Sequence, residues 1–221
     1  MKGLMVKDVL LLTQKKMFFA ILLVIAIVMN WYMDSSFVIG YFGMMGAILC
    51  ISTISYDEFD NGFPFLMTLP ISPKLYVIEK YLFSILCQLT ACAVAIIIQF
   101  ATLVVKAEPY VASEILLQDL AIVLVTTLFI AFMLPIEIKF GAEKGRTAIF
   151  LIAGIFFVIG VIAKTLYPHL QKIISIDTEA VIRKLESLPM AGVEAVLLVI
   201  VLVLLLISGF ISTKIMQKKE F

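Results

Sequence analysis

Six apolar stretches along this chain are each long enough to cross a lipid bilayer as a helix. They cover approximately residues 17–33, 37–55, 82–105, 120–136, 147–166 and 191–211. The mean hydropathy is +1.14, and charged residues make up only 15% of the 221 residues. A soluble fold of this length cannot bury so much apolar surface, so the chain is predicted to be an integral membrane protein.

The bilayer restricts the fold class further. Hydrocarbon offers no hydrogen-bond partner to the backbone, so each spanning stretch must be helical. The predicted fold is therefore an all-α, multi-pass membrane protein with six transmembrane helices. These helices form a single transmembrane domain over residues 1–221, and no soluble domain is expected.

The basic residues predict the orientation of the helices. Of the 17 lysines and arginines, twelve lie before the first stretch, after the last, or in the loops that follow the second and fourth stretches. The remaining five lie on the opposite side. Because cytoplasmic loops carry the excess of basic residues, both termini and these two loops are predicted to be cytoplasmic.

The first 14 residues have the pattern of an amphipathic helix. Met5, Val9 and Leu12 recur at helical spacing, whereas Lys7 and Asp8 are polar. This predicts a helix that lies in the cytoplasmic interface before the first span, with its charged residues facing water. A frayed tail is the alternative.

The loop after the second stretch, residues 56–74, is longer than a plain connector needs to be. It is acidic at its start and apolar in its middle, and Pro70 and Pro73 close it. Large apolar side chains exposed on a cytoplasmic loop indicate a docking surface, although they could also lie against the membrane interface. The residues expected to carry docking are Asp57, Glu58, Phe59, Asp60, Phe63, Phe65, Leu66, Leu69, Pro70 and Ser72.

Two further sites have both a functional and a purely structural interpretation. The short charged loop 137–146 follows Pro135 and could provide a second cytoplasmic contact, or it could be a simple connector. The residues of this contact would be Glu143, Lys144 and Arg146. In the second stretch, small residues let helices approach closely, within the subunit or at a seam with a second subunit, or they line a translocation path. These residues are Gly40, Gly43 and Gly46.

The sequence predicts no catalytic, metal or cofactor site. It contains one histidine, His169, and neither a phosphate-binding loop nor a hydrolase motif. Charged residues such as Lys106, Asp119 and Glu194 fall at the ends of the stretches, where they are expected to reach water. Ion-coupled transporters place such charges near the midplane, so energy for any transport is expected to come from outside the chain.

The whole chain resembles the permease subunits of ABC-2 type ABC transporters, in their small bacterial branch, and is similar in design to exporters of phenol-soluble modulins. The resemblance depends on the amphipathic start, the six spans and the segment after the second span. In that segment the matching residues are Tyr56, Asp57, Glu58, Asn61, Leu66, Leu69, Pro70, Ile71, Ser72, Lys74, Val77, Lys80 and Tyr81.

The resemblance implies a coupling helix between the second and third membrane helices. That helix would dock on a separate cytoplasmic ABC ATPase, which would bind ATP and Mg²⁺. A second permease subunit, identical or different, would complete the membrane part.

The sequence and the resemblance together predict a permease subunit in a bacterial cell membrane. It would belong to an ATP-driven exporter that moves a hydrophobic or amphipathic substrate, such as a peptide, out of the cell. The chain would not hydrolyse ATP and would contact lipid but no nucleic acid. The alternative is a membrane assembly or immunity protein that binds a partner without transport.

Overall fold

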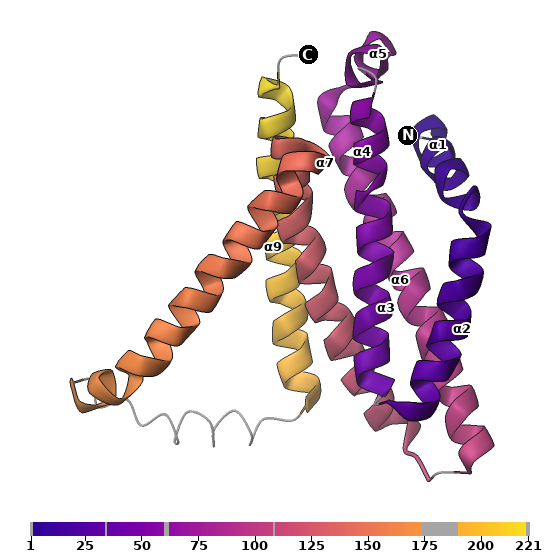
Figure 1. Ribbon diagram of the computed structural model, residues 1–221, viewed down its shortest axis with the longest axis vertical. Helices are drawn as coiled ribbons and strands as arrows, with labels where there is room; N and C mark the ends of the chain where they lie inside the picture. Colours follow the sequence, from indigo (N-terminus) through magenta and orange to yellow (C-terminus); the bar gives the residue numbers. More distant parts are fainter. Residues whose placement is uncertain (1, 34, 60–61, 108, 174–189, 220–221) are drawn as a thin grey trace.

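The computed structural model describes residues 2–33, 35–59, 62–107, 109–173 and 190–219, and every regular element among them is a helix. Figure 1 shows their arrangement. The helices are α1 (Lys2–Thr13), α2 (Lys16–Tyr32), α3 (Ser35–Ile51), α4 (Thr53–Glu58), α5 (Gly62–Thr68), α6 (Pro73–Lys106), α7 (Ala112–Ile173) and α9 (Met190–Lys218).

Four of the described segments are long and apolar enough to cross a membrane. They are Ser35–Glu58, Pro73–Lys106, Ala112–Gly141 and Gly192–Lys218. A fifth is reached if α1 and α2, which meet at an angle of 70°, count as one bent span. The prediction of an all-helical membrane protein is thus confirmed, with four to five candidate spans. The span expected at 147–166 falls in the second part of α7, whose side chains lie outside the described residues.

Helix α6 begins nine residues before the expected start at residue 82. Pro73 occupies its first turn, where a missing backbone N–H costs nothing. The Ser72 hydroxyl caps the helix by accepting a hydrogen bond from the Leu75 backbone N–H at 3.2 Å. As a result, residues such as Lys80 belong to a helix that packs in the bundle and not to a loop.

The loop expected at 137–146 is a kink inside α7. The helix continues past Pro135 and bends at Gly141, whose φ of 73° lies in the left-handed region that favours glycine. A Cβ atom at Gly141 would also lie only 2.5 Å from Oε2 of Glu58. Beyond the kink, α7 runs away from the other helices (Figure 1).

Both termini and the short helix α5 lie at the same end of the bundle, here called the termini end (Figure 1). Of the two apolar cores that the described residues form, one lies at this end and joins α5 to the longer helices. Its residues are Leu4, Ala47, Ile51, Ile54, Phe63, Leu66, Tyr76, Val77, Tyr81, Ile130, Leu134, Ile138 and Met216. The second core is smaller and packs α2 and α3 against α6.

The three glycines of α3 lie against other helices of the same chain. A Cβ atom at Gly46 would lie 2.8 Å from the Cβ of Ala91 and 3.0 Å from the backbone oxygen of Cys87. At Gly43 it would lie 2.8 Å from Sγ of Cys92, and at Gly40 it would reach a side-chain carbon of α7 at 3.4 Å. This geometry corresponds to packing within the subunit, one of the three interpretations that the sequence left open.

Candidate functional site

A group of charged and hydrogen-bonded side chains lies at the termini end, where α1, α4 and α6 meet, and all of them except the half-buried Lys7 are buried. We call Lys7, Asp8, Thr53, Asp57, Tyr76 and Lys80 the charge cluster. Its centre is Lys80, which is only 1% exposed. The Lys80 Nζ lies 2.5 Å from Oδ2 of Asp8 and 2.9 Å from Oδ2 of Asp57. The ammonium group therefore bridges an acid of α1 and an acid of α4.

Neutral groups and a second lysine complete the cluster. Lys80 donates to the Thr53 hydroxyl at 2.9 Å, and that hydroxyl lies 3.1 Å from Oδ2 of Asp8. The Tyr76 hydroxyl donates to Oδ2 of Asp57 at 2.9 Å. Lys7 forms ion pairs with Asp57 and, at 3.2 Å, with Asp8. Each acid thus has more than one partner.

The electrostatics of the cluster keep Lys7 charged. Burial lowers the pKa of Lys7, but the hydrogen bond to Asp57 and the two neighbouring carboxylates outweigh burial and leave its pKa raised. Burying an ion pair costs desolvation energy, so such a pair persists only where the geometry is good and each member has its partners. Removing one member would leave an uncompensated charge in the bundle.

A second ionic contact joins the C-terminal end to α4, α5 and α7. Lys219 Nζ lies 2.9 Å from Oε1 of Glu58 and donates to the Ile138 backbone oxygen at 3.2 Å. It also lies 4.6 Å from the centre of the Phe63 ring, a cation–π distance. Glu58 in turn fills the space left by the missing side chain of Gly141.

Helix α5 has one buried and one exposed face. Phe63 and Leu66 are 4% and 8% exposed, and the Phe63 ring packs edge-on against Tyr76 at 5.5 Å. By contrast, Phe65 is 69% exposed, and Phe59, just before α5, is 73% exposed. The inner face thus fixes α5 to the core, and the outer side presents aromatic rings to the surroundings.

A groove of about 550 Å³ runs between α1 and α5, beside the exposed rings. Its lining is largely apolar, with Lys7 and Asp57 of the charge cluster at one side. The lining residues are Gly3, Leu4, Lys7, Tyr56, Asp57, Gly62, Phe65, Leu66, Leu69, Pro70 and Ile71. The groove therefore connects the outer surface of α5 to the buried ions.

The structure divides the predicted docking residues into two groups. The side chains that turn inward or pair within the chain are Asp57, Glu58, Phe63 and Leu66. Those on the surface are Phe59, Phe65, Leu69, Pro70 and Ser72, the last as the cap of α6. Asp60 lies outside the described residues, as do the side chains of Glu143, Lys144 and Arg146.

The sequence did not predict that the charge cluster forms. Asp8 was expected on the water-facing side of α1, but it is fully buried, whereas Val9 is 47% exposed. The physical reason is that Lys80 offers Asp8 an ionic partner inside the bundle, while an apolar side chain can face lipid. The one sequence clue is that Tyr76 and Lys80 stand four residues apart, as on one face of a helix.

The expectation that charges at span ends reach water is wrong at two positions. Asp119 is 1% exposed and Glu194 is 6% exposed. Packing of neighbouring helices covers these side chains although they stand near the helix starts.

The packed apolar helices define a multi-pass helical membrane protein. A family model described as ABC-2 family transporter protein matches residues 3–217, so the chain belongs to the ABC-2 transporter family. Proteins of this family are membrane components of ABC transporters that usually work with a cytoplasmic ATPase subunit, and they are not themselves catalytic. No curated protein and no solved structure matches the chain.

Proposed function

We propose that the chain is the permease subunit of an ATP-driven exporter and that α5 receives a separate ABC ATPase. The observation that supports this most directly is that one face of the α5 region is buried while the opposite face exposes aromatic rings. Exposed aromatic side chains are typical of protein-binding surfaces, and they bind best when their own backbone is rigid. Here Phe63 and Leu66 supply that rigidity from the opposite face.

The charge cluster gives this surface a mechanical connection to the bundle. Asp57, close before α5, is bound to Tyr76 and Lys80 of α6. Lys80 is bound in turn to Asp8 of α1. Movement of α5 by an ATPase would therefore move α1, α4 and the start of α6 together. In this proposal Asp57 transmits the movement, while Phe59 and Phe65 make the contact.

The substrate proposed is hydrophobic or amphipathic, such as a peptide, and the direction is out of the cell. In the middle of the described bundle the polar groups around Gln88 are uncharged amides and hydroxyls. Such an interior suits a substrate that is held through apolar surface. A second permease subunit would form the other wall of the path.

The proposal can be tested by purifying the full chain from its native membranes in a mild detergent. We expect an ABC ATPase to co-purify and the complex to hydrolyse ATP, while the chain alone shows no turnover above background. Recovery of a different protein, with no ATPase present, would instead favour the non-transporting assembly or immunity protein.

Orientation can be tested separately with single cysteines placed in a variant that lacks Cys50, Cys87 and Cys92. Lys74→Cys lies at the termini end and leaves the Ser72 cap intact, while Ser113→Cys lies where α7 begins, at the opposite end (Figure 1). A membrane-impermeant maleimide should label Lys74→Cys only from inside the cell and Ser113→Cys only from outside. The reverse result would refute the proposed orientation.

A further inference from the structure

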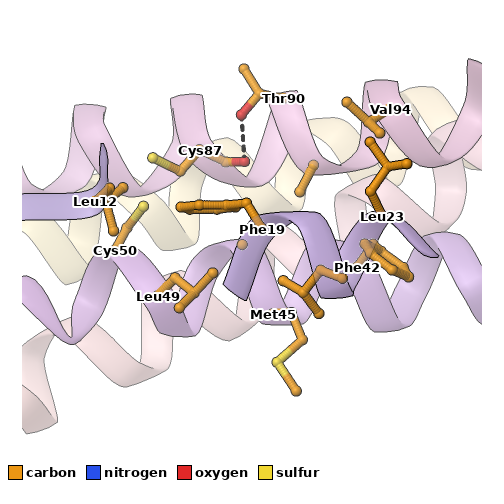
Figure 2. Close-up of a pocket in the computed structure, with 13 residues that line it drawn as sticks. Leu12, Phe19, Leu23, Phe42, Met45, Leu49, Cys50, Cys87, Thr90 and Val94 are labelled. Carbon is orange, nitrogen blue, oxygen red and sulfur yellow. Dashed lines mark hydrogen bonds between the residues drawn. The ribbon is translucent and has the colours of Figure 1, made fainter. Parts of the chain in front are cut away.

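An apolar cleft lies where the bend between α1 and α2 meets α3 and α6 (Figure 2). Its volume is about 310 Å³. Figure 2 shows the Phe19 ring between α3 and α6, with Leu12, Cys50 and Cys87 near one end of the ring. The lining residues are Leu12, Phe19, Leu22, Leu23, Phe42, Met45, Gly46, Leu49, Cys50, Cys87, Thr90, Ala91 and Val94.

The rim of this cleft faces outward while its floor is buried. Phe19, Leu23 and Val94 are between 39% and 49% exposed, whereas Gly46 and Cys50 are buried. Apart from Leu12 of α1, the residues of the cleft come from helices that are expected to cross the membrane, so the exposed rim faces hydrocarbon. An empty apolar cleft forfeits dispersion contacts, which a flexible hydrocarbon chain can restore.

The cleft continues toward two lysines at the bend. A neighbouring hollow of about 440 Å³ shares Leu12, Phe19 and Cys87 with the cleft and adds Lys16 to its lining. A further hollow of about 620 Å³ is lined by residues 13–18, which include Lys15 and Lys16 but no acid. Lys16 is exposed and has no ion-pair partner among the described residues. One apolar passage thus ends at an uncompensated positive charge.

We propose that this passage binds a phospholipid of the surrounding bilayer that carries an anionic headgroup. One acyl chain occupies the cleft beside Phe19, and the phosphate lies by Lys16. The inference is supported by charge complementarity at the mouth and by the continuous apolar lining behind it. It does not depend on the proposed ATPase, and it assigns the bend between α1 and α2 a role in lipid recognition.

The test is native mass spectrometry of the purified full chain in detergent micelles. The chain is titrated with dioleoyl phosphatidylglycerol or with dioleoyl phosphatidylcholine, which has the same acyl chains but no net charge. We expect one tightly retained phosphatidylglycerol per chain. Lys16→Gln should weaken its binding about fivefold, whereas Lys2→Gln, at another exposed lysine without a described ion-pair partner, should not.

A second pair of variants tests the acyl-chain part of the site. Val94→Trp should fill the cleft and abolish the retained phosphatidylglycerol, whereas Ile97→Trp, at a 68% exposed position of α6 outside the cleft, should leave binding unchanged. Helix content and monodispersity confirm that each variant is folded. Equal retention of the two lipids would overturn headgroup recognition, and equal binding by the two tryptophan variants would overturn the assignment of the cleft.

Discussion

Among the buried polar groups that hold α6 in the described bundle, two differ sharply in charge. At the termini end, the charge cluster binds α6 to α1 and α4 through full ion pairs. Farther along α6, Gln88 binds α7 with neutral groups only. Its amide nitrogen donates to the Val123 backbone oxygen at 3.0 Å and to the hydroxyls of Thr126 and Thr127 at 2.7 and 3.0 Å.

The contrast follows from the cost of charge in a membrane. A charged side chain is expensive near the bilayer centre and much less so near the interface, where water and headgroups are close. The charge cluster lies at the termini end, near the short helix α5. Gln88, by contrast, lies well inside the long apolar helix α6. Strong ionic contacts are thus found at the end that is proposed to move, and weaker, uncharged hydrogen bonds in the middle of the described bundle.

The largest effect is expected from Lys80→Met. The substitution keeps the length of the side chain but leaves Asp8 and Asp57 without their buried cation, so that only the half-buried Lys7 still pairs with them; the loss should cost about 3–5 kcal/mol. Thermal unfolding of the purified protein measures the loss. Adding Asp8→Asn should restore part of the stability, since one buried charge is then removed. If the single and double variants unfold alike, the ion pair is not what stabilises this end.

An intermediate effect is expected from Gly46→Leu on the packed face of α3. The new side chain would meet Ala91 and the Cys87 backbone, which cannot yield easily, so the cost should be about 1–3 kcal/mol. Gly209→Leu is the matched control, because nothing lies within 4 Å of its Cβ position apart from its chain neighbours and the nearby backbone of its own helix. Comparable melting temperatures for the two variants would show that α3 does not pack as described.

The smallest effect is expected from Gln88→Leu. The substitution removes the amide, but Thr126 and Thr127 still donate to the Val123 backbone oxygen, at 3.0 and 2.7 Å. The amide nitrogen carries two hydrogens and so makes two of these bonds at a time. Hydrogen bonds between membrane helices contribute about 0.6 kcal/mol each, so the total loss should be about 1 kcal/mol. The same unfolding assay compares it with Lys80→Met. A loss at Gln88 as large as at Lys80 would remove the contrast between the two groups.

The sequence predicted what depends on local pattern. The length of the apolar stretches predicted the membrane class and most of the helices. The prolines at 70 and 73 predicted the end of the segment that contains α5. The charge cluster could not be predicted, because residues 8, 57 and 80 are distant in the chain and meet only once α1, α4 and α6 pack. The kink at Gly141 was mistaken for a loop, since charged residues around a glycine fit either structure.

The most direct test of the central claim is the affinity between the permease and the ATPase that co-purifies with it. Phe59→Ala/Phe65→Ala removes the two exposed rings without touching the charge cluster, and it should weaken association by about 2–4 kcal/mol, or roughly 30- to 700-fold. Phe37→Ala is the control, because Phe37 is 56% exposed but lies at the first turn of α3, at the opposite end of the bundle (Figure 1). Unchanged affinity in the double variant would show that the exposed face of α5 is not where the ATPase docks.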